Sequence, residues 1–266
     1  MTRALQILEE IILRLNKNKN KLLSFTYGSE SAENSLFELS SLVRKSSIPD
    51  DELSRNLGLF LTPSCLGRIL FMDFLYKKII NVQGIVMEFG CRYGQNVALF
   101  NSLRNIYDPY NRLRKVVGFD SFEGFPEIVK NDGNNDIGDY SVPKDSYTNL
   151  KKIIDISKNF SPLPHINMCH VIKGDACKML PKFLKENPAT IIALSYFDMD
   201  IYKPTKFCLE NIIDRIPKGG IIGFDEVNDD DMPGETIALF DSIGLKNVSL
   251  RRFNPSARTS YFIKDF

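Results

Sequence analysis

The hydrophobic and polar positions of the chain follow two different patterns, and the change falls near residue 81. Up to that point apolar residues recur three or four positions apart, which is the spacing of an amphipathic helix. The clearest such stripe contains Leu5, Leu8, Ile11, Ile12 and Leu15. Further helix starts are indicated at Asp50-Asp51-Glu52 and at Thr62-Pro63, because acidic residues and proline favour the first turn of a helix. The sequence therefore predicts a helical region over residues 1–81.

Beyond residue 81 the pattern changes to short apolar runs of strand length. These runs are nearly continuous, as expected of strands covered on both faces, and occupy residues 84–90, 115–120, 169–174, 190–197 and 220–224. Helical segments separate most of them, at residues 95–106, 177–186 and 204–215. Strands that alternate with helices imply right-handed crossovers, so we predict a doubly wound parallel sheet.

The C-terminal part departs from this alternation. Residues 246–253 and 259–264 are strand-like segments joined by Asn254-Pro255-Ser256-Ala257, and no helix fits between them, so they should form an antiparallel hairpin. A parallel sheet that ends in such a hairpin is the topology of class I methyltransferases. We expect an α/β fold in two parts. Residues 1–81 would form an N-terminal helical cap or oligomerisation region, and residues 82–266 a methyltransferase domain with a Rossmann-like, doubly wound, seven-stranded sheet.

Composition and charge argue against several other classes of protein. The 266 residues are 43% hydrophobic and 25% charged with a formal net charge of +1, which disfavours binding to nucleic acid through a basic face. The apolar runs are too short to span a membrane, and Glu9 and Glu10 interrupt the N-terminal stretch, unlike in a signal peptide. Five cysteines without a Cys-x-x-Cys pair indicate buried thiols in a reducing compartment. We therefore expect a cytoplasmic protein that binds neither nucleic acid nor membrane.

A glycine-containing turn follows the first predicted strand, in the sequence Glu88-Phe89-Gly90-Cys91-Arg92-Tyr93-Gly94. Glycines at a strand–helix turn let the backbone approach a ligand closely, and the helix N-terminus offers free N–H groups. The E-x-G-x-x-x-G spacing departs from the G-x-G-x-x-G pattern of pyrophosphate-binding sites. S-adenosylmethionine has no phosphates, and its amino-acid moiety needs amides, carbonyls and a nearby carboxylate. We therefore expect this turn to bind S-adenosylmethionine through Glu88, Gly90, Arg92 and Gly94.

Acidic residues at the ends of the next two strands are candidates for binding the nucleoside part of this cofactor. Asp120 ends the second strand, where a carboxylate can accept hydrogen bonds from both ribose hydroxyls. The alternative for Asp120 and its neighbour Ser121 is a helix N-cap, but the preceding glycine turn favours the ribose role. Asp175-Ala176 follows the third strand, where a carboxylate can receive the exocyclic amine of adenine. Asp175 can equally cap the following helix, and the sequence leaves both roles open.

Four further carboxylates are expected at the carboxyl edge of the sheet, where ligands bind in open α/β folds. Asp198 and Asp200 follow the fourth strand two residues apart, so in an extended segment they face the same side. Asp225 and Glu226 follow the fifth strand. Like charges held together raise each other's pKa and destabilise the fold unless a cation lies between them. With no histidine or cysteine among them, the four suit a hard, oxygen-preferring cation such as Mg²⁺.

Several of these segments together resemble the macrocin O-methyltransferase-like family of Mg²⁺-dependent sugar and natural-product O-methyltransferases. The most specific are D-x-D-x-Y-x-x-T at residues 198–205 and F-D-S-F-E-G-F-P at residues 119–126. The glycine turn, Pro217-Lys218-Gly219-Gly220 leading to Phe224-Asp225-Glu226, and Pro233-Gly234 before a final helix occur in the same order. The resemblance covers roughly residues 67–245. Tyr196-Phe197 and Glu226 depart from the residues common in the family.

The resemblance implies a reaction and a set of residue roles. The chain would transfer a methyl group from S-adenosylmethionine, with the assistance of Mg²⁺, to a hydroxyl of a sugar, a nucleotide sugar or a glycosylated small molecule. Asp198, Asp225 and Glu226 would be the metal ligands. Asp198 would also lie beside the cofactor, and Asp200 would be the general base.

Two other functions are compatible with a Rossmann-like fold. An NAD(P)-dependent reductase or epimerase is suggested by Tyr147-x-x-x-Lys151, the spacing of short-chain reductases, although here it follows the second strand rather than a later one. A non-catalytic binding domain is disfavoured, since facing carboxylates without a ligand cost stability. The apolar stripe of residues 5–15 is expected either to pack on the chain's own core or to contact a second subunit in a homo-oligomer.

Overall fold

The structure is a computed structural model that describes residues 30–246 and 248–266, and the chain divides into two compact units, 1–63 and 64–266. The first unit contains helix α2 (Glu30–Arg44), the short helix α3 (Asp50–Leu53) and the 3₁₀ helix η1 (Ser54–Phe60). α3 begins with three acidic residues in its first turn, which confirms the helix start predicted there. The amphipathic helix predicted around residues 5–15 lies outside the described residues.

The second unit is built on a seven-stranded sheet with the strand order β3-β2-β1-β4-β5-β7-β6. The first five strands of this order are parallel, and β7 runs antiparallel to both β5 and β6. The strands are β1 (Ile85–Phe89), β2 (Val116–Asp120), β3 (Cys169–Lys173), β4 (Ile192–Phe197), β5 (Ile221–Phe224), β6 (Arg251–Phe253) and β7 (Ser256–Ile263). The predicted doubly wound sheet with its antiparallel C-terminal hairpin is confirmed. The hairpin turn is shorter than predicted, because β7 already begins at Ser256.

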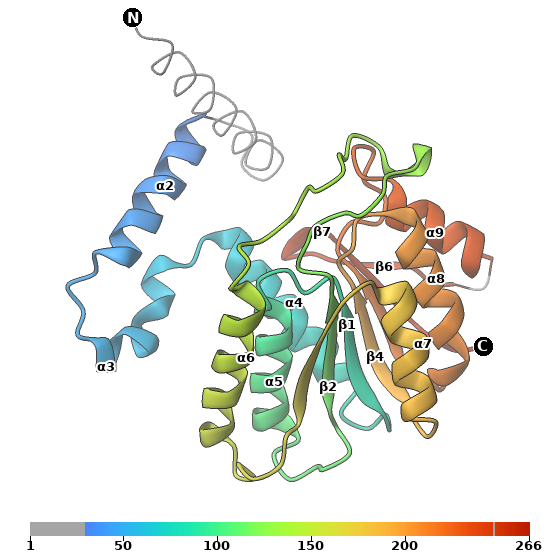
Figure 1. Cartoon of the computed structure of the whole chain (residues 1–266), viewed down its shortest axis with the longest axis horizontal. Helices are drawn as coiled ribbons and strands as arrows, with labels where there is room; N and C mark the ends of the chain where they lie inside the picture. The colour runs from blue at the N-terminus through green and yellow to red at the C-terminus, as the bar shows by residue number, and fades with distance from the viewer. Residues whose placement is uncertain (1–29, 247) are drawn as a thin grey trace, which may run out of the picture. The chain divides into compact units, whose positions relative to one another are not determined.

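Helices cover both faces of this sheet (Figure 1). One face carries α4 (Pro63–Lys78), α5 (Gln95–Tyr107) and α6 (Ser146–Ser157), and the other carries α7 (Ala176–Glu186), α8 (Tyr202–Ile212) and α9 (Gly234–Ser242). Single 3₁₀ turns lie at η2 (Lys130–Asp132), η3 (Lys158–Phe160) and η4 (Ile213–Arg215). Within the described part of the chain, no single helix is long and apolar enough to cross a membrane.

Alternation of side chains along the central strands creates two separate hydrophobic layers. In β1, Val86 packs in the layer of α4, α5 and α6, whereas Met87 and Phe89 pack in the layer of α7, α8 and α9. All five residues of β1 are therefore buried, which explains why such a strand reads in the sequence as a continuous apolar run.

Helix α4 packs on the C-terminal hairpin, far from it in the sequence. The ring centroids of Phe71 and Phe253 are 5.3 Å apart, and those of Phe74 and Tyr261 are 5.2 Å apart. A Cβ atom at Gly67 would come within 2.5 Å of the Pro255 carbonyl oxygen, so only glycine allows this approach. These contacts place α4 on the seven-stranded sheet, in the compact unit that begins at residue 64.

Candidate active site

The four predicted carboxylates converge at the carboxyl ends of β4 and β5. Asp198 directly follows β4, and Asp225 and Glu226 directly follow β5. Because β4 and β5 are neighbouring parallel strands, their carboxyl ends meet at one edge of the sheet. Asp200, Asp225 and Glu226 are almost completely buried. We call Asp198, Asp200, Asp225 and Glu226 the acidic cluster.

Arg68 of α4 bridges two members of the acidic cluster. Its Nη1 donates to Asp198 Oδ2 and its Nη2 donates to Asp225 Oδ2, each over 2.8 Å. The amide of Asn96, on α5, also donates to Asp198 Oδ2, over 3.2 Å. Arg68 lies 130 and 157 positions from its two partners in the sequence, so no local motif marks it as part of the site.

Two members of the acidic cluster, Glu226 and Asp225, have partners from β7 and β4. Arg258 forms ion pairs with Glu226 Oε1 and with Asp229, the latter over 3.0 Å. The hydroxyl of Tyr196 donates to Asp225 Oδ1 over 2.7 Å. Tyr196, one of the departures from the family pattern, thus orients a predicted metal ligand. Glu226 Oε2 is buried and has no hydrogen-bond partner among the described residues.

The backbone places Asp200 differently from the prediction. β4 ends at Phe197, and Asp200 adopts a left-handed conformation with a φ angle of 60°. Its carboxyl group lies within hydrogen-bonding reach of Glu226, whereas Asp198 faces Arg68. A left-handed conformation at a residue other than glycine costs about 1–3 kcal/mol and is found preferentially at functional sites. Asp198 and Asp200 therefore share one cluster but bind different partners.

Glu235 connects the two loops that carry the acidic cluster. It lies in the first turn of α9 and is completely buried. Its Oε1 accepts a hydrogen bond from the Met199 backbone N–H over 3.1 Å, and its Oε2 accepts one from the Glu226 backbone N–H over 3.3 Å. The segment after β4 and the segment after β5 are thereby held at a constant separation.

Burial and mutual repulsion raise the pKa values in the acidic cluster. Loss of hydration, followed by the charge of Asp225, raises the pKa of Asp198 to about 7. Loss of hydration is also the largest cause for Asp200, whose pKa rises to about 6, and for Glu226, whose pKa rises strongly. The four carboxyl groups face only two positive charges, those of Arg68 and Arg258, so part of the acidic cluster holds protons at neutral pH.

The carboxylate oxygens of this cluster fit a hard divalent cation, but a guanidinium lies between two of the carboxylates. All donors are carboxylate oxygens, the unpartnered Glu226 Oε2 is available, and a cation would relieve the repulsion. In the described residues, however, no three acidic, histidine or cysteine side chains are arranged to hold a metal ion together. The Arg68 guanidinium lies between Asp198 and Asp225 instead.

The two glycines of the turn after β1 are required by the packing of the chain itself. Gly90 has a φ angle of 90°, and a Cβ atom there would lie 1.8 Å from the Asp198 carbonyl oxygen. Gly94, with a φ angle of 88°, would place a Cβ atom 2.3 Å from the Leu150 side chain. Gly90 thus brings the turn into direct contact with the segment that carries the acidic cluster.

Asp120 organises this turn. Its Oδ2 accepts a hydrogen bond from the Arg92 backbone N–H over 2.7 Å, and its Oδ1 accepts one from the Phe122 backbone N–H over 2.5 Å. Each carboxylate oxygen keeps a further lone pair for another donor. Ser121 accepts a hydrogen bond from the Glu123 backbone N–H, so neither residue caps a helix.

Glu88 and Arg92 present unpartnered polar atoms beside the same turn. Glu88 is completely buried, and neither of its carboxylate oxygens has a hydrogen-bond partner among the described residues. Burial, followed by the nearby charge of Asp198, raises the pKa of Glu88 well above its usual range. The Arg92 guanidinium lies 5.1 Å from the Tyr93 ring and 5.0 Å from the Tyr140 ring, and its Nε is also buried without a partner.

Asp175 has the capping role that the sequence left open. Its Oδ1 accepts a hydrogen bond from the Cys177 backbone N–H over 2.9 Å, which caps α7 at its first residue, Ala176. Contact of Asp175 or Ala176 with adenine remains a prediction.

Tyr140 is a further residue at the site, and it was not among the site residues predicted from the sequence. It comes from the loop between β2 and α6, its ring centroid lies 5.2 Å from that of Phe125, and its hydroxyl lies 3.7 Å from Met232 Sδ. Burial, followed by the charges of Asp200 and Glu226, raises the pKa of its hydroxyl. Tyr140 therefore lies beside the acidic cluster, although it comes from a different loop than the carboxylates.

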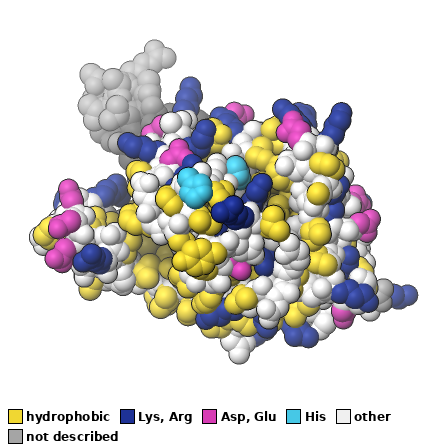
Figure 2. All heavy atoms as spheres, turned by 90° about the horizontal axis from the view of Figure 1, so that it is seen from below, with side chains coloured by type: hydrophobic (Ala, Val, Ile, Leu, Met, Phe, Trp, Pro, Cys, Tyr) yellow, Lys and Arg dark blue, Asp and Glu magenta, His cyan; other side chains and the backbone are white. Residues whose placement is uncertain are grey.

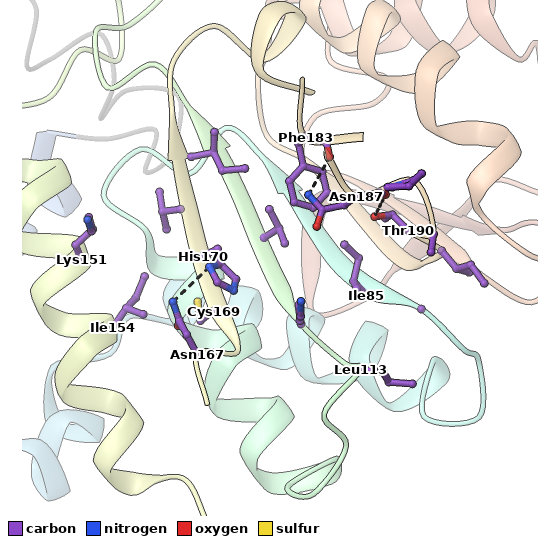
Figure 3. A pocket seen from close by; sticks show the side chains of 18 of the residues that line it. Ile85, Leu113, Lys151, Ile154, Asn167, Cys169, His170, Phe183, Asn187 and Thr190 are labelled. Carbon is purple, nitrogen blue, oxygen red and sulfur yellow. Dashed lines mark hydrogen bonds between the residues drawn. The ribbon is translucent and has the colours of Figure 1, made fainter. Parts of the chain in front are cut away.

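A cavity of about 720 Å³ lies along the edge strand β3, between α6 and the end of α7 (Figure 3). It contains Tyr147 and Lys151, the pair that suggested a reductase, together with His170, whose Nδ1 lies 3.3 Å from the Asn167 amide. Figure 2 shows the histidine side chains of this face among hydrophobic and basic ones. The cavity lies at β3, and β2 and β1 separate β3 from β4, which leads into the acidic cluster. Tyr147 and Lys151, which line the cavity, therefore do not belong to the acidic cluster.

Comparison with known proteins gives a family for the chain. Residues 74–241 match the sequence model of the macrocin-O-methyltransferase (TylF) family. The calicheamicin methyltransferase CalS11 is 37% identical with a TM-score of 0.85, over 88% of this chain and 93% of that protein. Apo CalS11, described as a TDP-rhamnose 3'-O-methyltransferase, is 36% identical with a TM-score of 0.79, over 88% of this chain and 95% of its own. The O-methyltransferase NovP is 18% identical with a TM-score of 0.56, over 75% of this chain and 80% of its own, and shares the fold. No curated protein matches the chain.

The sheet topology, the glycine turn and these matches define an S-adenosylmethionine-dependent methyltransferase of class I. The chain belongs to the macrocin-O-methyltransferase (TylF) family. The resemblance found in its sequence motifs is therefore confirmed, and the chain is an O-methyltransferase that uses S-adenosylmethionine.

Proposed function

We propose that this enzyme methylates a hydroxyl of a sugar, carried as a nucleotide sugar or on a glycosylated metabolite, with the assistance of Mg²⁺ in the cytoplasm. The observation that carries the proposal is the acidic cluster, in which Glu226 Oε2 has no partner among the described residues. The acceptor class is supported by CalS11, which is described as acting on TDP-rhamnose and is 36% identical over 88% of this chain. The buried thiols Cys91, Cys169 and Cys208 suit a reducing compartment.

The turn after β1 would hold the cofactor. The buried, unpartnered carboxyl group of Glu88 suits the ammonium group of the methionine moiety, and the unpartnered Arg92 Nε suits its carboxylate. The free lone pairs of Asp120 suit the ribose hydroxyls. Gly90 and Gly94 would keep the backbone of this turn in place, with Ser121, Asp175 and Ala176 bordering the nucleoside.

Asp198, Asp225 and Glu226 would hold the divalent cation, because they supply only oxygen donors at one edge of the sheet. When bound, such a cation lowers the pKa of a hydroxyl and thereby makes it a better nucleophile. Glu235 would keep the three ligands at a constant separation through its two backbone hydrogen bonds.

Asp200 would be the general base. As the acceptor oxygen attacks the methyl carbon, the new O–CH₃ bond forms and the sulfonium S–CH₃ bond breaks, leaving S-adenosylhomocysteine. The hydroxyl proton would pass to the Asp200 carboxylate, whose left-handed backbone directs it into the acidic cluster. Tyr140, beside Asp200 and Glu226, would border the acceptor and orient its ring.

The acceptor assignment is tested with S-adenosylmethionine labelled in its methyl group and a panel of nucleotide sugars, free sugars and glycosylated metabolites. We expect label on a sugar hydroxyl of at least one nucleotide-linked or glycoside acceptor, and none on the free sugars. Label on the aglycone alone, or reduction of a sugar with NAD(P)H, would contradict the proposal.

Replacement of Asp120 tests the cofactor site. Asp120→Ala should weaken S-adenosylhomocysteine binding by about 1.5–3 kcal/mol, the contribution of hydrogen bonds to a charged group, as measured by calorimetry. Asp230→Ala is the matched control, because it removes an exposed carboxylate outside the proposed site. It should leave binding unchanged. Unchanged affinity in a folded Asp120→Ala variant would remove Asp120 from the site.

A further inference from the structure

We propose that Arg68 is an internal counter-cation that competes with the divalent cation for Asp198 and Asp225. This inference rests on the proposed metal-assisted function and adds a regulation of the same site. Without metal, Arg68 would neutralise the two carboxylates. With metal bound, its side chain would be displaced from them.

The competition follows from two shared carboxylate groups. Arg68 uses Oδ2 of Asp198 and Oδ2 of Asp225, each over 2.8 Å, and these two residues are proposed metal ligands. One guanidinium contacts both oxygens, so the two atoms are close enough to face a single positive charge. A divalent cation held by the same two carboxylate groups would bring a second positive charge next to the guanidinium, and the two positive charges would repel each other.

The surroundings of Arg68 allow its side chain to move while its helix stays in place. The Arg68 side chain is 31% exposed, in contrast to 6% for Asp225, so it can reach solvent without crossing the core. The backbone of α4 is held on the hairpin by Phe71, Phe74 and the close approach at Gly67. Displacement would therefore change side-chain torsions and leave the helix where it is.

The test measures binding of Mn²⁺ to the full-length protein by electron paramagnetic resonance, without cofactor or acceptor. Arg68→Met removes the charge but keeps an unbranched apolar side chain. We expect it to bind Mn²⁺ about 5- to 150-fold more tightly than the unmodified protein, the usual range for two coupled binding events. In chelator it should also unfold at a lower temperature, and Mn²⁺ should raise that temperature more than in the unmodified protein.

Two further variants make the result specific. Arg68→Lys keeps a charge but cannot present two parallel N–H groups to both aspartates, so its affinity should be intermediate. Lys77→Met removes the same charge from an exposed position of α4, where Lys77 pairs with Asp73 over 2.7 Å, and should bind Mn²⁺ like the unmodified protein. If Arg68→Met fails to fold, tighter binding by Arg68→Lys carries the same conclusion.

The outcomes separate this inference from the proposed function. If the unmodified protein binds Mn²⁺ clearly and the Arg68 variants bind it equally or more weakly, Arg68 only organises the site. That result would overturn the proposed competition but not the proposed metal site. Absence of Mn²⁺ binding at millimolar concentration in the unmodified protein and in all folded variants would overturn the metal proposal as well.

Discussion

Replacement of Asp200 by asparagine should slow methyl transfer by about 10²- to 10⁴-fold, the usual contribution of a general base. Asparagine has nearly the same shape but cannot accept the proton of the acceptor hydroxyl. Binding of S-adenosylhomocysteine and of Mg²⁺, measured by calorimetry, should remain, because Asp200 is not among the proposed ligands. Asp230→Asn is the matched control, since Asp230 is exposed in the neighbouring acidic loop, and its rate should not change.

The pH dependence gives this prediction a second measurement. Burial raises the pKa of Asp200 to about 6, and a base works only when it is deprotonated. The kcat/KM of the unmodified enzyme should therefore fall as the pH decreases through about 6, and that limb should be missing in the residual activity of Asp200→Asn. A variant that keeps both the full rate and the acid limb would assign the base to another group.

Removal of the metal should have an effect of similar size. We expect a chelator to abolish turnover and Mg²⁺ to restore it, because an unassisted sugar hydroxyl is almost entirely protonated at neutral pH. Asp198→Ala should lose several kcal/mol of transition-state stabilisation, at least about 10³-fold in rate, and added Mg²⁺ should not restore it. If chelator-treated enzyme methylates its acceptor at the full rate, the acidic cluster acts without a metal and Arg68 and Arg258 are its permanent counter-charges.

Helix α6 was not among the helices predicted from the sequence. Its buried residues Leu150 and Ile154 lie one turn apart, and this spacing could have indicated a helix. The segment is short, and it follows a loop that starts after Asp120 and has no regular apolar period. The Tyr147-x-x-x-Lys151 spacing within it matches that of short-chain reductases. Instead, Tyr147 packs on Phe122, with ring centroids 5.2 Å apart.

The residues that hold the acidic cluster in place could not be found from the sequence for a different reason. Arg68, Arg258 and Glu235 are ordinary charged residues in their own segments, and none of them belongs to a motif. Arg68 reaches Asp198 because α4 packs on a hairpin that lies almost 200 positions away, at Phe253 and Tyr261. Such contacts depend on the packing of distant elements, which local periodicity does not describe.

The sequence by itself determined the sheet, the hairpin, the family and the set of carboxylates at the carboxyl edge. It could do so because buried parallel strands read as continuous apolar runs, and because residues that follow neighbouring strands must meet at one edge. Only the tertiary structure decided how the carboxylates are partnered: Arg68 lies between Asp198 and Asp225, and Asp200 turns toward Glu226 through a left-handed backbone. The physical reason is that charge balance in a buried site is set by side chains from every element packed around it, wherever they stand in the chain.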